Sequence, residues 1–297
     1  MRLFVTGASG FFGQALVRRL IDTGHTAVCL VRPSSEIKLA DMQDKIEIIS
    51  GDMNDVDFWK SKLDKIDAFI NLIGIIREFP SRGITFEKYH YLFTVELVKL
   101  AREIGAKRFL QMSALGSSLE SKALYHRTKF KAEEYLRASD LEWTILRPSL
   151  IIGKGNEALG MMVKLINSAP ITPVIGSGNY CMQPVDISNV SEAFVKALND
   201  KHTIGKTYDL VGPDRMTYNQ MLDRIGQVMD KKIKRVSMPT GLMKFVTAPF
   251  EYFSSFPLTT GQIDMLLEEN ISDSVEIYDD LKIKQISFKD SLNKALK

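Results

Sequence analysis

A serine, a tyrosine and a lysine are spaced as groups that could move a proton at a carbonyl oxygen. Tyr125 and Lys129 stand four residues apart in a segment with helical character, so both side chains would share one helix face. Ser113 stands 12 residues before Tyr125, directly after an apolar run. A free tyrosine titrates near ~10, and a neighbouring ammonium lowers that pKa by stabilising the phenolate. We interpret Tyr125 as general acid–base, Lys129 as the group that lowers its pKa, and Ser113 as donor to the substrate oxygen. The alternative is a surface Tyr–Lys pair without chemistry.

A glycine-rich turn at the start of the chain predicts a dinucleotide site beside these residues. The apolar run Leu3-Phe4-Val5 leads into Thr6-Gly7-Ala8-Ser9-Gly10-Phe11-Phe12-Gly13, and helical spacing follows. Glycines at this spacing allow a tight turn, a close approach of a pyrophosphate, and close packing of helix on strand. The N–H groups at the helix start then face the anion. The predicted contacts in this turn are Thr6, Gly7, Ser9, Gly10, Phe11, Phe12 and Gly13.

Three later strand ends supply the other predicted nucleotide contacts. The second strand ends at Val31, and Arg32 stands where an acidic residue would select NAD, so a guanidinium there favours the 2′-phosphate of NADP. A solvated arginine compatible with either cofactor is the alternative. After the third strand, Asp52 and Met53 could meet the adenine, or Asp52 could cap the next helix. After the fourth strand, Leu72-Ile73-Gly74 would pass close to the inner ribose.

Apolar runs alternate with helical patterns through the first half of the chain, which predicts an α/β fold with a Rossmann-type, doubly wound parallel sheet. The expected strands are 3–5, 26–31, 46–49, 68–73, 108–112 and 143–146, and the expected helices are 14–20, 58–63, 86–104 and 125–138. Ligands of such sheets bind at the carboxyl ends of the strands.

The pattern loosens after Pro148, where glycines and prolines interrupt the chain. We expect a dinucleotide-binding domain over 1–150 and a smaller substrate or lid lobe over 151–297, with 182–212 returning to the sheet. That stretch holds a predicted helix at 188–198 and a strand at 207–211. A helix at 218–229 and two or three helices within 240–297 are also expected.

Composition limits the classes of function. A formal charge of +3 over 297 residues is too small and dispersed to indicate nucleic-acid binding. Cys29 and Cys181 lack metal-ligand spacing, so no metal site is expected, and they are consistent with reduced thiols. No apolar stretch reaches the length of a membrane span, and the first residues already belong to a strand rather than a signal peptide. We expect a cytoplasmic location.

The two motifs together resemble the short-chain dehydrogenase/reductase superfamily in its extended or atypical branch. Thr-Gly-x-x-Gly-x-x-Gly at 6–13 and Tyr-x-x-x-Lys at 125–129 are that family's signatures, and Ser113 stands at its serine position. The chain is most similar to the subgroup of the nucleotide-binding accessory subunit of respiratory complex I, within the NAD-dependent epimerase/dehydratase-like proteins. Segments 71–78, 86–90, 113–116, 183–187 and 258–270 carry this likeness.

The resemblance implies further contacts and one difference. The segment 146–153 is similar to the one whose backbone meets the nicotinamide carboxamide, which assigns Pro148 and Leu150 to the cofactor. Lys129 could in addition bond the nicotinamide ribose, and Tyr125 is also expected among the residues that contact the cofactor. Extended members usually carry an asparagine near position 90 and a glycine–threonine pair shortly after it. This chain has His90 and Phe93-Thr94, so the fourth member of the usual catalytic tetrad is not matched.

These observations support three functions. The first is an NADP(H)-dependent oxidoreductase, with NAD as the alternative cofactor, acting on a small carbonyl or alcohol substrate that is apolar if the Met- and Phe-rich lobe lines its site. The second is a catalytically silent, nucleotide-bound assembly or accessory protein, in which the apolar segment 241–258 contacts a protein partner. Ser113, Tyr125 and Lys129 would then be an inherited cofactor clamp. The third is a nucleotide-sugar epimerase or dehydratase.

Overall fold

The centre of the molecule is a seven-stranded parallel sheet. The computed structural model describes residues 1–168, 171–251, 253, 256 and 258–297. The strand order is β11-β6-β5-β4-β1-β2-β3, with every neighbouring pair parallel. The chain order reverses between β1 and β4, which is where ligands of doubly wound sheets bind. The strands are β1 (Arg2–Thr6), β2 (Thr26–Val31), β3 (Ile46–Ser50), β4 (Ala68–Asn71), β5 (Arg108–Met112), β6 (Glu142–Pro148) and β11 (Lys206–Leu210).

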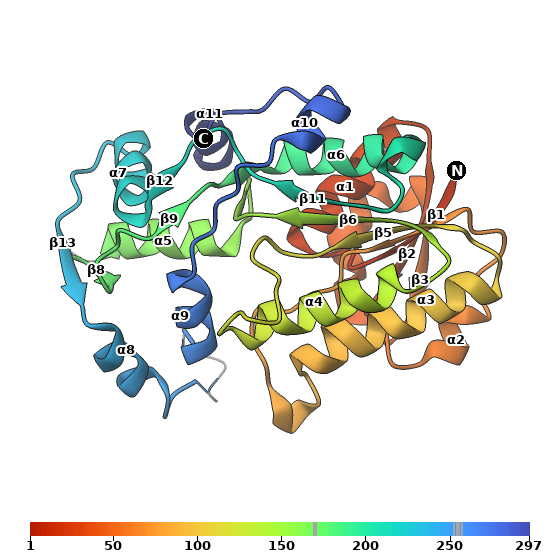
Figure 1. The fold of residues 1–297 in the computed structure, drawn as a ribbon, viewed down its shortest axis with the longest axis horizontal. Coiled ribbons are helices and arrows are strands. Elements are labelled where there is room, and N and C mark those ends of the chain that lie inside the picture. The colour runs from red at the N-terminus through yellow and green to blue at the C-terminus, as the bar shows by residue number, and fades with distance from the viewer. Residues whose placement is uncertain (169–170, 252, 254–255, 257) are drawn as a thin grey trace.

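Helices cover both faces of this sheet, as the predicted fold class requires (Figure 1). On one face α1 (Phe11–Asp22) and α6 (Ile187–Asn199) enclose a core that includes Leu16 and Phe194. On the other face α2 (Val56–Lys60), α3 (Phe93–Glu103) and α4 (Leu124–Arg137) enclose a second core that includes Trp59 and Leu97. The doubly wound Rossmann-type prediction is therefore confirmed.

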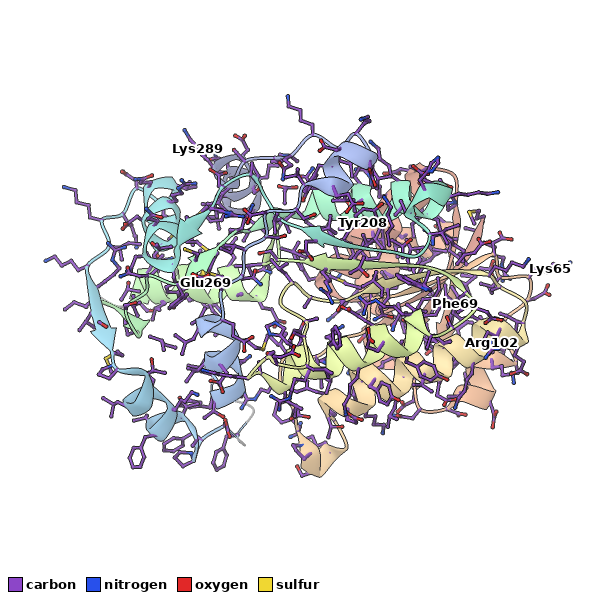
Figure 2. The ribbon with its side chains drawn as sticks, viewed as in Figure 1. Lys65, Phe69, Arg102, Tyr208, Glu269 and Lys289 are labelled. Atoms are coloured by element: carbon purple, nitrogen blue, oxygen red, sulfur yellow. The ribbon has the colours of Figure 1, made fainter. Side chains whose placement is uncertain are left out.

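Side chains on the strands alternate between these two cores because successive residues of a strand point to opposite faces. Figure 2 shows Phe69 and Tyr208 within the layers, and each is only 1% exposed. Lys65 and Arg102 lie on the exposed outer edge in the same view. Burial on both faces of the central strands accounts for their continuous apolar runs in the sequence.

Short helical turns complete the connections between strands. They are η1 (Pro33–Lys45), η2 (Pro80–Arg82), η3 (Glu87–Leu92) and η4 (Lys201–Thr203). The helix expected over 86–104 begins with η3, a turn of π-helix, and continues as α3. The fourth strand ends at Asn71 rather than at Ile73, because the Asn71 side chain accepts from the Ile73 N–H (3.2 Å) and turns the chain out of the sheet.

The second half of the chain adds a smaller layer beside the carboxyl ends of the strands (Figure 1). Its third core includes Met182, Met221 and Leu292. Among the described residues, 240–297 holds four helices rather than the two or three expected, because α10 is a separate short turn packed near β11. Besides α6, the helices after residue 150 are α5 (Glu157–Ser168), α7 (Tyr218–Val228), α8 (Thr240–Thr247), α9 (Thr260–Leu267), α10 (Glu276–Asp280) and α11 (Phe288–Leu296).

Three two-stranded ladders link these helices. They are β7 (Ile151–Ile152) with β10 (Val185–Asp186), β8 (Thr172–Ile175) with β13 (Arg235–Met238), and β9 (Cys181–Met182) with β12 (Met216–Thr217). Two elements that follow residue 150, α6 and β11, lie in the layers of the main sheet. The division into a domain at 1–150 and a smaller lobe at 151–297 stays a prediction. None of the helices in the described ranges is long and apolar enough to cross a membrane.

Candidate functional site

The turn between β1 and α1 has the shape of a phosphate cradle. Gly7 adopts φ +76°, and a Cβ there would lie 3.0 Å from the carbonyl carbon of Leu72. A Cβ at Gly13 would lie 2.2 Å from the carbonyl oxygen of Gly7, so the first turn of α1 packs directly on the loop. Gly10 begins the helix and offers no side chain to its free N–H groups. This geometry fits a pyrophosphate bound by main-chain N–H groups.

The side chains of Thr6, Phe11 and Phe12 contact the protein, so these residues can offer a ligand their main-chain atoms. The Thr6 hydroxyl donates to the Oδ1 of Asn71 (2.7 Å) inside the sheet. Phe12 is buried in the core under α1, and Phe11 packs against the same core. Ser9 is half-buried at the tip of the turn. The chain therefore supplies a cradle rather than a set of charged side chains here.

The ends of β2 and β3 lie along the same edge of the sheet. Arg32 is exposed directly after β2, and within the described part of the chain its guanidinium has no hydrogen-bond or ion-pair partner. Asp52 accepts from the main-chain and side-chain nitrogens of Asn54 (2.8 and 2.6 Å). The alternative that Asp52 caps the next helix is wrong, because Asp55 occupies the cap of α2. Met53 is buried, so only its main chain can face a ligand.

Lys129 connects the carboxyl ends of two central strands. Its Nζ donates to the carbonyl oxygens of Ile73, after β4, and Met112, at the end of β5, both at 3.2 Å. A Cβ at Gly74 would lie 3.0 Å from this nitrogen, so glycine leaves the room that the ammonium occupies. Burial lowers the pKa of Lys129 to about 8. Ser113 follows Met112, which places the predicted lysine and serine at the same strand end.

Tyr125 lies one turn before Lys129 on α4, and its ring is half-buried against His90 (ring centroids 5.1 Å apart). Burial raises the pKa of Tyr125 to about 12, whereas the sequence-based interpretation required a lowered value. The physical reason is that the Lys129 amine is directed to main-chain carbonyls and is itself desolvated. The Ser113 hydroxyl lies 3.1 Å from that of Ser117.

A buried polar network beneath the site was not predicted from the sequence. Asn71 is fully buried at the end of β4, and its Nδ2 donates to Gln111 Oε1 (3.0 Å) and Thr94 Oγ1 (3.1 Å). Its Oδ1 accepts from Thr6 and from the N–H of Ile73. The network thus fixes the ends of three adjacent strands and the carbonyl that accepts from Lys129. The sequence feature that could have indicated this network is an asparagine at the end of an apolar strand.

The segment after β6, which the resemblance assigned to the nicotinamide, is held by main-chain hydrogen bonds. The Pro148 carbonyl accepts from Leu115 N (3.0 Å), and the Leu150 carbonyl accepts from Val185 N (2.9 Å). Ser149, between them, is buried and donates to the Asn270 side chain. The C-terminal part of the chain therefore reaches the edge of the candidate site.

Glu268, which follows α9, ties this C-terminal part to the start of α4. Its carboxylate lies 2.7 Å from Nδ1 of His126, and it accepts from Ser121 Oγ (2.9 Å) and Lys122 N (2.8 Å). Burial lowers the pKa of His126, although the carboxylate opposes that shift. No sequence pattern indicated this contact, because the partners are 142 residues apart.

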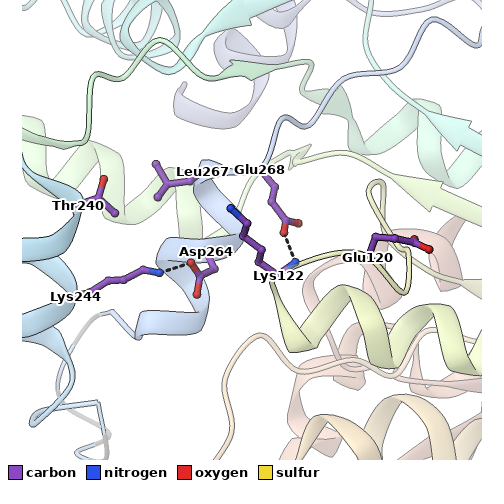
Figure 3. A pocket seen from close by; sticks show the side chains of 7 residues that line it. All are labelled: Glu120, Lys122, Thr240, Lys244, Asp264, Leu267 and Glu268. Atoms are coloured by element: carbon purple, nitrogen blue, oxygen red, sulfur yellow. Dashed lines mark hydrogen bonds and ion pairs between the residues drawn. The ribbon is translucent and has the colours of Figure 1, made fainter.

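A cleft of about 410 Å³ opens beside this junction, between α8, α9 and the loop that precedes α4 (Figure 3). Lys244 and Asp264 form an ion pair on one side of it. The lining is mostly charged and is not the methionine-rich surface considered from the sequence. The lining residues are Glu120, Lys122, Thr240, Lys244, Asp264, Leu267 and Glu268.

Within the apolar segment 241–258, helix α8 lies at the outer end of the smaller layer (Figure 1). Leu242, Phe245, Phe250 and Phe253 are exposed, Phe245 to 79%. Arg77 fixes the end of the segment by donating to the main-chain oxygens of residues 251, 253 and 256 at 2.5 to 2.7 Å. Positions 252, 254, 255 and 257 of this predicted partner surface lie outside the described residues.

Comparisons with known proteins show which family the chain is related to. A family model described as NAD(P)H-binding matches residues 7–166. The chain is 31% identical to NADH dehydrogenase [ubiquinone] 1 alpha subcomplex subunit 9, mitochondrial, from Arabidopsis thaliana, over 94% of this chain and 73% of that protein. It is 27% identical to the photosystem II assembly factor Ycf39 of Guillardia theta, over 86% of this chain and 78% of the relative.

A solved UDP-glucuronic acid 4-epimerase from Bacillus cereus, in complex with UDP-glucuronic acid and NAD, has the same fold. It superposes with a TM-score of 0.76 at 19% identity, covering 99% of this chain and 97% of the epimerase. The chain spans 56% and 63% of two further complex I relatives, so it matches only part of their length. Since these relatives are described as mitochondrial, the cytoplasmic location stays a prediction.

The resemblance noted in the sequence is thereby confirmed. The glycine turn, the seven-stranded sheet and the relatives agree on one assignment. The chain belongs to the NAD(P)H-binding family, and subunit 9 of the NADH dehydrogenase [ubiquinone] 1 alpha subcomplex is one of its relatives.

Proposed function

We propose that this chain is an NADP(H)-dependent oxidoreductase of the short-chain type that acts on a carbonyl or alcohol. The observation that carries the proposal is the position of Lys129, whose amine joins the ends of β4 and β5 next to Gly74. A buried amine at the carboxyl ends of β4 and β5, next to the switch point of a doubly wound sheet, has few structural reasons to be there, because burial of a charge costs stability.

The nucleotide would lie along the carboxyl edge of the sheet. The N–H groups at the start of α1 would bind its pyrophosphate, with Gly7, Gly10 and Gly13 leaving the room. Arg32, exposed at the end of β2, would bind a 2′-phosphate, which favours NADP over NAD. Once bound, the nicotinamide ring supplies or accepts the hydride.

The chain's own residues would handle the proton and the substrate oxygen. With a pKa of about 12, Tyr125 keeps its proton at neutral pH and can act as the acid in a carbonyl reduction. The Ser113 hydroxyl would donate a second hydrogen bond to that oxygen. Two of the three Lys129 donors are used by main-chain carbonyls within the described residues, so the third can serve a ribose hydroxyl.

The substrate would approach from the smaller layer, through the cleft beside Lys122. Because charged side chains line this cleft, we favour a substrate with a polar or charged group in addition to its carbonyl. This revises the apolar substrate considered from the sequence. The experiment that tests the reaction does not depend on whether the substrate is polar or apolar.

The experiment compares Tyr125→Phe with the wild type for NADPH oxidation across a panel of carbonyl compounds. Loss of the phenolic proton should reduce turnover by about 100-fold or more, while the dissociation constant of NADPH stays within about threefold. Tyr135→Phe, which alters a half-buried tyrosine on the same helix, is the matched control and should retain activity. Unchanged turnover in Tyr125→Phe would remove Tyr125 from the mechanism.

A second candidate is a nucleotide-bound accessory protein without turnover. The exposed side chains of Leu242, Phe245, Phe250 and Phe253 favour it, because so many exposed large apolar groups in one short segment are unusual without a partner. The relatives named as a complex I subunit and an assembly factor are consistent with this role. It predicts bound NADP(H), no turnover over the panel, and a protein partner that is lost in Phe245→Gln.

A further inference from the structure

His90 is the buried histidine of η3, the π-helical turn that precedes α3. π-helical turns inside longer helices occur frequently at functional sites. Its ring stacks on Phe86 (centroids 5.2 Å apart, planes within 18°) and meets the edge of the Tyr125 ring. The family resemblance left this position unmatched, and neither the nucleotide cradle nor the proton chemistry above uses it.

Both ring nitrogens of His90 have partners, and the partners lie on different elements. Nδ1 lies 2.9 Å from the hydroxyl of Thr128 on α4. Nε2 lies 3.2 Å from the N–H and 3.1 Å from the carbonyl oxygen of Ile75, in the loop after β4. Either neutral tautomer satisfies both sides, because each partner offers a donor and an acceptor. The imidazole therefore forms a bridge between the β4 loop and the helix that carries Tyr125 and Lys129.

Both partners of the His90 bridge lie close in the chain to groups that position the Lys129 amine. Thr128 directly precedes Lys129, and Ile75 lies two residues after Ile73, whose carbonyl accepts from the amine. A Cβ at Gly74 would lie 3.0 Å from the Lys129 nitrogen and 3.8 Å from Nε2 of His90. Both side chains thus lie close to Gly74 of the loop, so the position of the loop relative to α4 limits the space around the amine.

We propose that His90 is a positioning residue that holds the loop 73–75 against α4 and thereby keeps the Lys129 amine at the ends of β4 and β5. The role of that amine toward a nucleotide rests on the proposed function, whereas the bridge itself does not. A neutral ring suits the role, since a second positive charge beside Lys129 would oppose the ammonium. The buried setting and the Lys129 charge accordingly lower the pKa of His90 to about 2.

The titratable groups around the amine are few. Tyr125 and Glu133 lie on its own helix, one turn to either side, and His90 faces it from η3. Burial is the main cause that lowers the pKa of Lys129, with Glu133 acting in the opposite direction. Release of the loop would admit water and would therefore raise that pKa.

The test is an NMR titration of lysine side chains in the full-length, nucleotide-free protein. The Lys129 signal is identified by its absence from Lys129→Met. In His90→Phe, which keeps the aromatic ring and its stacking but removes both hydrogen bonds, the Lys129 midpoint should rise by roughly one unit. In His90→Gln, whose amide can replace the Ile75 side of the bridge but not the Thr128 side, the midpoint should rise by less than in His90→Phe.

Two further variants separate positioning from stability. Thr203→Val removes hydrogen bonds of a fully buried threonine at η4, outside the site, so it should lower the melting temperature without moving the midpoint. Thr128→Val removes the α4 side of the bridge at nearly equal volume and should shift the midpoint in the same direction as His90→Phe. It also provides the measurement if His90→Phe does not fold.

An unchanged Lys129 midpoint in both His90→Phe and Thr128→Val would overturn the proposal, and so would an equal shift in Thr203→Val. A shift in His90→Gln as large as that in His90→Phe would also overturn it, since the Ile75 contact would then not matter. Parallel NADPH titrations should show about tenfold weaker binding for His90→Phe. If the wild type binds no nucleotide, the proposed function fails, while the NMR result still decides the role of His90.

Discussion

Replacement of Lys129 by methionine should make the stability of the protein less dependent on pH. The side chain is 3% exposed, and burial lowers its pKa from 10.5 to about 8. Between these values the unfolded chain holds a proton that the folded chain has lost, so wild-type stability rises with pH across this window. At about 1.4 kcal/mol per pKa unit, the buried ammonium costs about 3 kcal/mol below pH 8.

Lys129→Met removes this cost but also removes two hydrogen bonds to carbonyls, each worth about 1 kcal/mol. The variant should therefore be slightly more stable than the wild type at pH 7 and less stable near pH 10.5. The difference between the two free energies of unfolding should change by about 3 kcal/mol over this range. Nucleotide affinity should fall at every pH, because the amine is lost.

The assay is urea unfolding of both proteins from pH 7 to 10.5, without nucleotide. Lys131→Met is the matched control, because Lys131 lies on the same helix, is exposed and pairs with Glu87 at 3.2 Å. Its difference from the wild type should stay within about 0.5 kcal/mol. If Lys129→Met follows the wild type in parallel over this range, the amine is not buried in the way described, and the reasoning is refuted.

Two further predictions concern the turn and the C-terminal contact. Gly13→Ala should destabilise the fold by about 3 kcal/mol and weaken nucleotide binding, because its Cβ would lie 2.2 Å from the Gly7 oxygen; Gly160→Ala, with open space around it, should be neutral or slightly stabilising in the same unfolding assay. Glu268→Ala should cost about 2 kcal/mol and speed limited proteolysis of the C-terminal part, because it removes the acceptor of His126. The exposed Glu269→Ala should do neither, and equal proteolysis rates for both would contradict the role of Glu268.

The fold could be predicted from the sequence because each βα unit has a recognisable local sequence pattern. The apolar run at 26–31 is continuous because β2 is buried on both faces, and the glycines at 7–13 mark a turn where backbone and helix must approach closely. Tyr125 and Lys129 were predicted on the same helix by their spacing alone. Each of these features depends on residues only a few positions apart, so it can be recognised in the sequence.

The remaining features depend on contacts across the fold. Asn71 ends β4 and joins Thr6 to Gln111, although nothing near it in the chain indicates those partners. Glu268 meets His126 after a separation of 142 residues. The pKa of Tyr125 was predicted in the wrong direction because the spacing shows neither the burial of the phenol, which raises its pKa, nor the carbonyls to which the Lys129 amine is directed.

The central claim is that the edge of the sheet beside the glycine turn binds a pyridine dinucleotide and distinguishes its 2′-phosphate. Calorimetric titration of the wild-type protein with NADPH and with NADH tests it most directly, with Arg32→Glu measured in parallel. We predict that NADPH binds the wild type more tightly than NADH and that Arg32→Glu reverses this order. Failure of both dinucleotides to bind the wild type would contradict the account.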